Sequence, residues 1–388
     1  MEAFDVVVIG AGLAGLQCAR LLAAQGFRIL LVDRKPTVGH SVHTTGIFVR
    51  RTLEDFALPE DCLGPSVRHV TLYSPARRSM ELVSPHAEFR VGRMARLYER
   101  FLRECLEAGV EWSPQTRFID AVADGYNSVV TLEGQGFTRR VLTSLIVGAD
   151  GANSRVARAL DLDQNCEWII GVEEVLDKVP LEGPPTFHCF LNPRLAPGYL
   201  AWAVHDGEEV HIGVGGYAER FDPHKALHEF KNSLSGIFDL RRARFIEKRG
   251  GRIPVGGVMR RIASERGLLI GDAAGAVSPL TAGGLDPCMR LSTFAAGVIT
   301  EYLTGGNQTS LAAYSGAQFR ARFTSRLWLR RVLKSIHNPA LVEMACGVMR
   351  LPIFRSFAWH VFFGRNSFPD VDQSIDSSSR IELAESKS

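Results

Sequence analysis

The N-terminal part of the chain alternates between apolar runs and a glycine-rich turn. Residues Val6–Ile9 form an apolar run, which predicts a buried strand. Apolar residues then recur at helical spacing from Leu16 to Leu22, and a second apolar run over residues 28–32 ends at Asp33. This pattern predicts a strand, a turn, a helix and a second strand. The turn contains three glycines, Gly10, Gly12 and Gly15.

The spacing of these glycines predicts a site for a dinucleotide. Gly10 permits the tight turn, Gly12 lets the backbone approach a pyrophosphate, and Gly15 lets helix and strand pack closely. The helix N-terminus presents free N–H groups and the positive end of its dipole to the phosphates. Asp33 is placed to accept hydrogen bonds from the adenosine ribose. We therefore expect cofactor contacts from Gly10, Gly12, Leu13, Ala14, Gly15, Asp33 and Arg34.

Beyond residue 66 the apolar pattern changes period several times. Alternation over residues 67–91 and 169–252 predicts the strands of a mostly antiparallel sheet. Residues 92–112 return to helical spacing, with Gly109 as the expected stop. After Gly284 the pattern is helical to about Phe363. Further strands are expected near residues 117–122, 128–132 and 141–147.

These patterns predict an α/β fold, in which a Rossmann-type domain carries an inserted, mostly antiparallel β-sheet domain and a C-terminal helical region. The nucleotide-binding domain is expected to be discontinuous, because its motifs lie near both ends of the chain. Its expected segments are residues 1–66, 92–168 and 253–310. The other expected parts are a substrate domain over 67–91 and 169–252, a helical cap over 311–369 and a disordered, serine-rich tail over 370–388.

Composition narrows the class of protein. A chain of 388 residues with 46% hydrophobic content can form ~2 domains. The net charge of +3 argues against nucleic-acid binding as the main role. The 7 cysteines include no CxxC pair, so we expect buried, reduced thiols and neither a disulfide framework nor a metal site.

The chain also shows no expected targeting or membrane-spanning segment. The first strand begins so close to Met1 that no secretory signal fits before it. No run reaches the roughly 18 apolar residues of a transmembrane helix. We therefore expect a cytoplasmic protein, with peripheral association at a membrane surface left open.

A second glycine-rich segment, GLLIGDAAGAVSPLTAGGLDP, spans residues 267–287. It resembles the C-terminal FAD motif of the p-hydroxybenzoate hydroxylase-type flavoproteins, which include aromatic hydroxylases, halogenases and geranylgeranyl reductases. The resemblance implies FAD as the cofactor, with Asp272 near the ribityl chain and pyrophosphate. It also implies that the following stretch runs beside the isoalloxazine ring. The contacts implied in this segment come from Gly271, Asp272, Pro279, Gly283 and Gly284.

A third segment, Leu145–Arg158, resembles the GADG-containing segment that hydroxylases and reductases of this class share. It reads as an apolar strand, a turn and the start of a helix. Ser154 stands where a helix N-cap is expected, because its side-chain oxygen can accept a hydrogen bond from a free backbone N–H group.

Within this class the chain most resembles the geranylgeranyl reductase family, over about residues 1–310. Gly275 stands where aromatic hydroxylases usually have histidine, and residues 196–204 resemble the family's substrate-domain segment. In the family, aromatic side chains of this segment line an apolar tunnel for an isoprenoid chain, which implies Tyr199 and Trp202 as substrate contacts. Packing in an ordinary strand core is the alternative interpretation. With Trp202 aligned, the family's tyrosine falls on Leu200, and its Phe-Pro pair falls on Val204 and His205.

The family also carries a cysteine near the flavin, where this chain has His43 or Thr44. A histidine titrates near neutral pH and can manage a proton, so His43 is our candidate catalytic residue, with a purely structural role as the alternative. Arg93 opens the helix after the first excursion into the substrate sheet. Related enzymes often place an FAD-contacting arginine there, which implies the same role for Arg93.

These observations predict an FAD-dependent oxidoreductase that acts on a hydrophobic small molecule, with hydride transfer at flavin N5 to or from a carbon–carbon bond. NAD(P)H is one candidate electron donor. Residues 213–216, GVGG, are interpreted as a strand end and turn, because no helix with an acidic strand end is expected after them. Two alternatives stay open: an NAD(P)H-dependent flavin monooxygenase, and a flavin-bound isomerase or cyclase without net redox change.

Residues 320–365 combine basic and aromatic side chains with a single acidic residue, Glu343. Two interpretations stay open. The segment could lie on an anionic membrane surface, or it could be a helical cap whose aromatic side chains close over the substrate sheet while the arginines face water. The basic residues are Arg320, Arg322, Arg326, Arg330, Arg331, Lys334, Arg350, Arg355 and Arg365.

Overall fold

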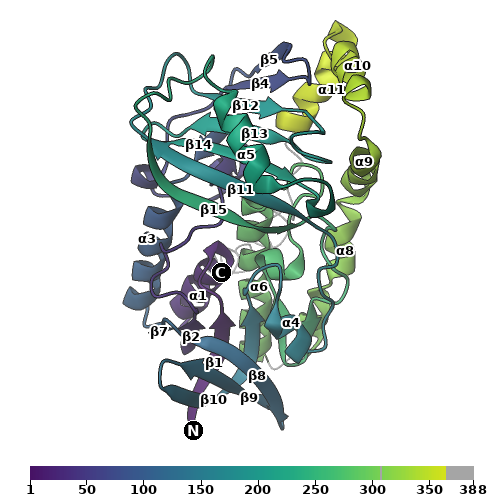
Figure 1. Cartoon of the computed structure of the whole chain (residues 1–388). Coiled ribbons are helices and arrows are strands. Elements are labelled where there is room, and N and C mark those ends of the chain that lie inside the picture. Colours follow the sequence, from purple (N-terminus) through teal and green to yellow (C-terminus); the bar gives the residue numbers. More distant parts are fainter. Residues whose placement is uncertain (306–307, 364–388) are drawn as a thin grey trace, which may run out of the picture.

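Two β-sheets, one above the other in Figure 1, are flanked by helices along their length. This computed structural model describes residues 1–305 and 308–363. The expected tail, 370–388, and the end of the expected cap, 364–369, lie outside the described residues. The α/β class predicted from the sequence is confirmed, while the exact domain boundaries stay a prediction.

The lower sheet has eight strands with a parallel centre. Residues Val6–Val8 of its central strand are completely buried, because neighbouring elements cover both faces, and this explains the unbroken apolar run. The hairpin of β8 (Arg117–Asp124) and β9 (Asn127–Gly134) extends the sheet from β10. The other strands, in spatial order, are β16 (Ala263–Ser264), β17 (Gly267–Leu269), β10 (Phe137–Gly148), β1 (Glu2–Ile9), β2 (Ile29–Val32) and β7 (Glu111–Ser113).

Helix α1 (Leu13–Ala24) packs against both α3 (Met94–Glu107) and α6 (Leu285–Gly305) beside this sheet. The helix predicted over residues 92–112 is shorter than expected. Gly109 has φ +86°, a left-handed conformation that stops the helix, and the chain then returns as β7.

Ser154 caps the short helix α4 (Arg155–Ala159), as the sequence predicted. Its Oγ accepts a hydrogen bond of 2.9 Å from the backbone N–H of Ala157. The Ser154 hydroxyl in turn donates to Asp150, 2.6 Å away. Two further short helical elements precede the strands of the upper sheet along the chain, namely α2 (Arg50–Asp55) and the 3₁₀ turn η1 (Glu60–Cys62).

The upper sheet has seven strands, all paired antiparallel to their neighbours except β12 with β4. Helix α5 (Pro223–Asn232) covers β11 and β14, and Asp222 caps it. A small ribbon of β3 (Ile47–Val49) and β6 (Phe89–Val91) lies apart from both sheets. In spatial order the seven strands are β15 (Arg244–Pro254), β11 (Trp168–Asp177), β14 (Val210–Gly216), β13 (Ala201–His205), β12 (Thr186–Phe190), β4 (His69–Tyr73) and β5 (Ser79–Val83).

Residues 213–216 form the end of β14, as predicted. After the 3₁₀ turn η2 (Ala218–Arg220) the helix α5 follows, although no helix was expected there. Strand β14 has antiparallel neighbours on both sides, so the parallel βαβ context of a nucleotide loop is missing here. A Cβ atom at Gly213 would lie 2.2 Å from Trp202 Cζ2, so the glycine makes room for that ring.

The C-terminal helices run along one side of the molecule, from the lower sheet to the upper one (Figure 1). Among the described residues, no helix combines the length and apolarity needed to cross a bilayer. All seven cysteines are free, and Cys166 is exposed, against the expectation that each is buried. After α6 these helices are α7 (Gln308–Ala313), α8 (Gly316–Ala321), α9 (Thr324–Ser335), α10 (Pro339–Met349) and α11 (Pro352–Phe363).

Candidate active site

A single large cavity, about 1360 Å³ in volume, is lined by residues of both sheets and of the C-terminal helices. Sites for one small ligand have volumes of roughly 300–1,000 Å³. This cavity therefore has room for a dinucleotide and a second molecule. The two glycine-rich segments predicted from the sequence line one part of it, and apolar side chains line the other.

The turn between β1 and α1 forms one wall of the cavity. A Cβ atom at Gly10 would lie 2.3 Å from Ala149 O, and one at Gly15 would lie 1.8 Å from Gly10 O. Both positions are therefore filled by neighbouring backbone. A Cβ atom at Gly12 would meet nothing within 4 Å, so open space lies against the backbone at the N-terminus of α1. That open backbone is where a pyrophosphate fits.

Asp33 holds the same turn from the end of β2. Its Oδ2 accepts a hydrogen bond of 2.7 Å from the Ala11 N–H group, and its Oδ1 accepts one of 2.9 Å from Lys35 N. Asp33 and Arg34 both line the cavity, next to Leu13 of α1. The carboxylate predicted to bind ribose is thus fixed at the edge of the glycine turn.

The second glycine-rich segment forms another part of the cavity wall. The 3₁₀ turn η3 (Gly271–Ala274) follows β17, and a Cβ atom at Gly271 would lie 2.9 Å from Ala14 Cβ. Asp272 is half-buried and lines the cavity, and removal from water raises the pKa of its carboxyl to about 6. Such a carboxylate needs hydrogen-bond donors, and the hydroxyl groups of a ribityl chain are suitable ones. Together with the open backbone at Gly12, these residues fit FAD.

Three predicted cofactor residues do not line the cavity in the described part of the chain, and their contact with FAD stays a prediction. Gly15 packs against the β1–α1 turn. Pro279 O accepts a hydrogen bond of 2.5 Å from Arg330 Nε, while Gly283 and Gly284 beyond it do line the cavity. Arg93 precedes α3, and its Nη2 lies 2.9 Å from Glu208 Oε1.

The apolar part of the cavity lies between the upper sheet and the C-terminal helices. Sheet residues and helix residues face it from opposite sides, which gives a chamber with few polar groups. An aliphatic chain in such a chamber would be held by hydrophobic and dispersion contacts. Its walls include Leu72 and Phe187 from the sheet, Leu200 from the loop before β13, and Leu333, Met349 and Val361 from the helices.

Tyr199 and Trp202, the predicted substrate contacts, both line the cavity. Their rings meet edge to face with centroids 6.4 Å apart. The Tyr199 hydroxyl donates to Thr281 O at 2.6 Å, and the Trp202 Nε1–H group donates to Glu173 Oε2 at 3.0 Å and lies 3.1 Å from Thr45 Oγ1. Each ring is therefore held in place by a polar end that bonds to the protein.

His43 also lines the cavity and keeps an exposed ring. Partial burial lowers its pKa, and the positive charges of Lys35 and Arg34 lower it further. The neutral imidazole is therefore favoured near neutral pH, and a neutral imidazole is a weaker proton donor than an imidazolium.

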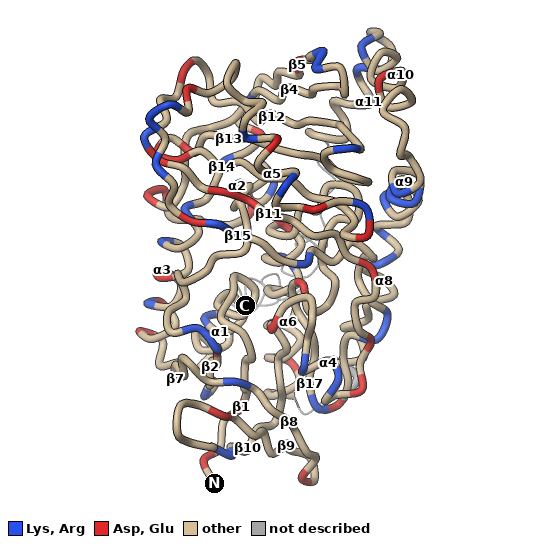
Figure 2. Tube along the Cα trace, in the orientation of Figure 1, with Lys and Arg blue, Asp and Glu red and all other residues tan. Residues whose placement is uncertain are grey.

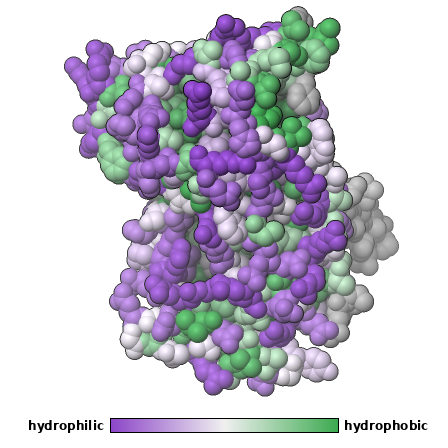
Figure 3. Space-filling model, turned by 45° about the vertical axis from the view of Figure 1, so that its right-hand side comes forward, coloured by the Kyte–Doolittle hydropathy of each residue, from purple (hydrophilic) through white to green (hydrophobic). Residues whose placement is uncertain are grey.

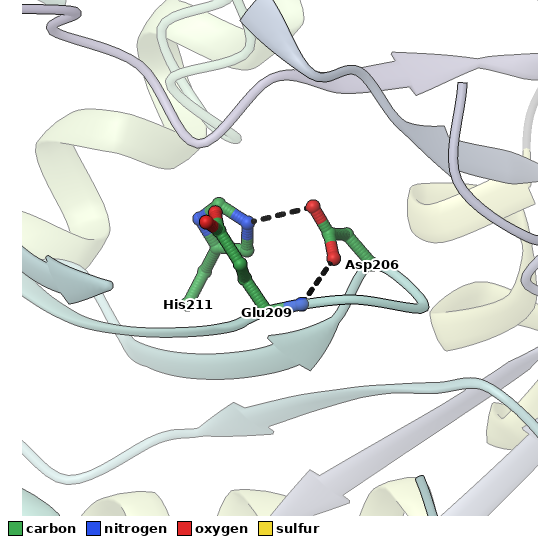
Figure 4. Close-up of side chains that lie close together, drawn as sticks. All are labelled: Asp206, Glu209 and His211. Atoms are coloured by element: carbon green, nitrogen blue, oxygen red, sulfur yellow. Dashed lines mark hydrogen bonds and ion pairs between the residues drawn. The ribbon is translucent and has the colours of Figure 1, made fainter. Parts of the chain in front are cut away.

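Sequence reasoning missed a buried polar network behind Trp202. Glu173, on β11, receives hydrogen bonds from Trp202 and Thr45, and it also lines the cavity. His211, on β14, places Nδ1 3.3 Å from Glu173 Oε1 and Nε2 3.4 Å from Asp206 Oδ2. Arg249 Nη1 lies 3.4 Å from Glu173 Oε1 as well. Figure 4 shows the outer end of this network, where Asp206 and Glu209 flank the imidazole ring.

The charges of this network support one another. Burial favours neutral groups, but hydrogen bonds with Asp206 and Glu173 outweigh it and raise the pKa of His211 to about 9. Against the same cost of burial, the hydrogen bond from His211 lowers the pKa of Asp206 to about 2 and also lowers the pKa of Glu173. His211 therefore carries a proton at neutral pH, between two carboxylates.

Asp206, Glu209 and His211 have the residue types of a metal site, and their ligand atoms lie within 4.8 Å of one another. Both ring nitrogens of His211 already face carboxylates, however, so the imidazolium itself supplies the positive charge between them. The sequence signal for this network was a polar residue in the middle of an apolar strand. Glu173 and His211 both interrupt such runs.

Comparison with known proteins places the chain in a family. The FAD binding domain family matches residues 3–323. The digeranylgeranylglycerophospholipid reductase of Methanocaldococcus jannaschii is 25% identical over 363 residues, which cover 89% of this chain and 90% of the relative. Digeranylgeranylglycerophospholipid reductase 1 of Methanopyrus kandleri is 29% identical over 366 residues, with 90% of this chain and 95% of the relative covered.

Two solved structures share the fold. A geranylgeranyl bacteriochlorophyll reductase-like protein from Thermoplasma acidophilum has a TM-score of 0.81 and 18% identity, and the match covers 97% of this chain and 99% of that one. The p-nitrophenol 4-monooxygenase from Pseudomonas putida DLL-E4 has a TM-score of 0.71 and 16% identity, with 94% and 100% covered. The chain thus belongs to the FAD binding domain family and is an FAD-dependent oxidoreductase similar to the geranylgeranyl reductases.

Proposed function

We propose that this chain reduces carbon–carbon double bonds of an isoprenoid chain carried by a lipid. The observation that carries the proposal is the single cavity, in which the predicted FAD segments and an apolar chamber adjoin. Its volume of about 1360 Å³ leaves room for a long apolar chain beside the cofactor. The names of the digeranylgeranylglycerophospholipid reductases, to which the chain is similar, agree with this substrate class.

FAD, when bound and reduced by an electron donor, would supply a hydride from its N5 atom to one carbon of the double bond. The residues of this chain bind the cofactor, hold the double bond and exclude water. Trp202 and Tyr199 form the rigid wall of the chamber, because each ring is tied by a hydrogen bond at its polar end. Holding the reacting carbon in place accounts for a large part of such a rate enhancement.

The second carbon of the double bond needs a proton, and we propose that Thr45 and Glu173 deliver it. Both residues line the cavity, and the Thr45 hydroxyl donates to Glu173. For this step His211 Nδ1 would first transfer its proton to the Glu173 carboxylate. The resulting carboxylic acid would then donate that proton to Thr45 Oγ1 as the Thr45 hydroxyl gives its own proton to carbon. The buried imidazolium is thereby the proton store of the site.

The network also suggests how His211 regains its proton. Asp206 Oδ2 lies 3.4 Å from His211 Nε2, on the side away from Glu173. Glu209, beside it in Figure 4, is partly exposed. The carboxylates at this end can pass a proton inward from solvent, so that the apolar chamber stays dry while the proton arrives from behind the sheet.

The direct test is anaerobic. Purified protein with FAD reduced by dithionite is mixed with a geranylgeranyl glycerophospholipid, and the flavin absorbance is followed while products are analysed by mass spectrometry. We expect reoxidation of the flavin and a product that gains two hydrogen atoms per reduced bond. Reduced flavin that persists with every isoprenoid lipid offered would contradict the proposal.

One observation favours a second candidate, a flavin monooxygenase. His43 and Thr44 stand where the reductase family has a cysteine, so the chain departs from that family beside the expected flavin position. A monooxygenase would consume NAD(P)H and oxygen, and its product would contain one atom from labelled oxygen gas. A flavin-bound isomerase or cyclase would instead leave the mass of its substrate unchanged. Product mass therefore separates all three.

A further inference from the structure

The C-terminal helices expose an unusual number of large apolar side chains. Trp328 on α9 is 62% exposed, Met344 on α10 is 64% exposed, and Ile353 on α11 is 82% exposed. Scattered apolar residues are normal on a protein surface, but a contiguous group marks an interaction site. The other exposed members of the group are Leu341, Val348, Leu351, Phe354 and Trp359.

The members of this group on α10 and α11 lie at one end of the molecule. Leu341, Met344 and Val348 lie three and four residues apart, so they share one face of α10. Leu351, between α10 and α11, and Ile353, in the first turn of α11, are exposed as well. Helices α10 and α11 project beside the upper sheet in Figure 1, and hydrophobic residues cluster over the same end in Figure 3. We call the exposed apolar residues of α10, of α11 and of the connection between them the apolar tip, namely Leu341, Met344, Val348, Leu351, Ile353, Phe354 and Trp359.

Arginines surround the apolar tip (Figure 2). Arg331 on α9 and Arg355 on α11 are exposed, as are Arg77 and Arg78 in the neighbouring β4–β5 hairpin. Glu343 is the single acidic residue between residues 320 and 363, and its Oε2 accepts a hydrogen bond of 2.9 Å from Ala76 N. The surface around the tip is therefore basic.

The same helices face the cavity on their other side. Met349 of α10 and Ala358 and Val361 of α11 line it. Arg355 Nη2 donates to Glu81 O at 2.6 Å, which fixes α11 to the β4–β5 hairpin. The helical pair thus separates an apolar chamber from an apolar outer surface. The inner face of this segment therefore caps the substrate sheet, while apolar side chains on its outer face are exposed.

We propose that the apolar tip docks on an anionic lipid bilayer. Large apolar side chains can enter the boundary between head groups and acyl chains, while the surrounding arginines attract anionic head groups. A second copy of this chain is a poorer partner, because a two-fold contact would bring the same basic rim against itself. The inference rests on the surface of the helices and not on the proposed reaction.

Flotation with vesicles tests the proposal. The full FAD-loaded protein is mixed with vesicles of phosphatidylcholine, with or without phosphatidylglycerol, and centrifuged through a density gradient. We expect the protein to float with the anionic vesicles and to be released in part by added salt, because salt screens the arginines. Protein that stays at the bottom with both kinds of vesicle would overturn the proposal.

A matched pair of variants locates the surface. The double variant Met344→Glu, Ile353→Glu places two acidic groups in the apolar tip. We expect its affinity for vesicles to fall by at least about tenfold. The control is Tyr126→Glu, because Tyr126 is 87% exposed in the turn between β8 and β9, at the opposite end of the molecule. It should bind vesicles like the unchanged protein. None of the three positions lines the cavity, so both variants should keep their FAD absorbance.

Two results would contradict lipid binding by the apolar tip. Equal flotation of the double variant and the control would show that lipid binds elsewhere on the molecule. Light scattering provides the second check. If the unchanged protein is a dimer and the double variant a monomer, while neither floats, the tip is an interface between copies of this chain.

Discussion

Glu173 and Trp202 meet across a glycine. In the register of the upper sheet, Gly213 of β14 lies directly between Glu173 of β11 and Trp202 of β13. Because Gly213 has no side chain, the indole crosses over it, and its Nε1–H group reaches Glu173 Oε2 at 3.0 Å. A single glycine thereby joins the wall of the apolar chamber to the buried acid behind it.

Replacing this glycine should separate the two groups. In Gly213→Val the new side chain occupies the position of the indole, since even a Cβ atom lies 2.2 Å from Trp202 Cζ2. We expect a loss of about 1–3 kcal/mol in the free energy of unfolding, measured in urea, together with reduced turnover. Gly297→Ala is the control, because a Cβ there meets nothing within 4 Å and α6 should gain helix propensity. Equal stability of Gly213→Val and the unchanged protein would show that the indole is free to move.

Glu173→Gln keeps the shape of the side chain and removes its charge. If Glu173 passes the proton, turnover should fall by about 10²-fold or more with little change in KM. The matched control is Glu174→Gln, on the opposite face of the same strand, where the carboxylate pairs with Lys231 Nζ at 2.6 Å. A similar loss in both variants would indicate a structural effect and not proton transfer.

The variant His43→Ala tests which group supplies the proton: His43, as predicted from the sequence, or the buried network of Glu173 and His211. The pKa of His43 is lowered, first by burial, so the residue is mostly neutral when the reaction needs a proton donor. We expect His43→Ala to retain most of its turnover with an identified substrate. A loss as large as that of Glu173→Gln would make His43 the proton donor and leave Glu173 with a positioning role.

Stability should depend on pH through His211. Its pKa is raised from about 6.5 to about 9, so the stabilisation is complete below about pH 6.5 and is lost as the pH rises through about 9. The change is at most about 3 kcal/mol, since one pKa unit corresponds to about 1.4 kcal/mol. Urea unfolding at several pH values measures it. In His211→Gln the decline on the alkaline side should disappear, and parallel curves for the two proteins would contradict this role.

Asp33→Ala should weaken retention of FAD. The variant loses both the expected ribose contact and the 2.7 Å hydrogen bond that holds Ala11 N in the glycine turn. Gel filtration followed by the flavin absorbance measures the retained cofactor. Asp5→Ala is the control, because Asp5 Oδ2 also accepts a backbone N–H, from Arg28 at 2.7 Å, but at the other end of β1. An Asp33→Ala protein that stays fully yellow would refute the assignment.

The sequence by itself determined the nucleotide-binding part of this protein. The glycine turn after β1 and the Ser154 cap of α4 are local features, because each depends on backbone geometry within a few residues. The acid after β2 is predictable because a strand–helix–strand unit has a regular spacing that places it beside that turn. The resemblance of residues 267–287 to a known FAD motif added the cofactor. The fold class followed, since the period of the apolar residues reports which faces are buried.

The tertiary structure alone decided what lies behind and around the reaction chamber. Glu173 and His211 are far apart in the sequence, and the register of β11 against β14 brings them together. Arg93 pairs with Glu208 of a distant turn, a contact that its local sequence does not announce, while its predicted contact with FAD stays a prediction. The two faces of α10 and α11 likewise became distinct only once the sheet had packed against one of them. Contacts of this kind depend on strand register and helix packing over long separations, which local sequence patterns do not encode.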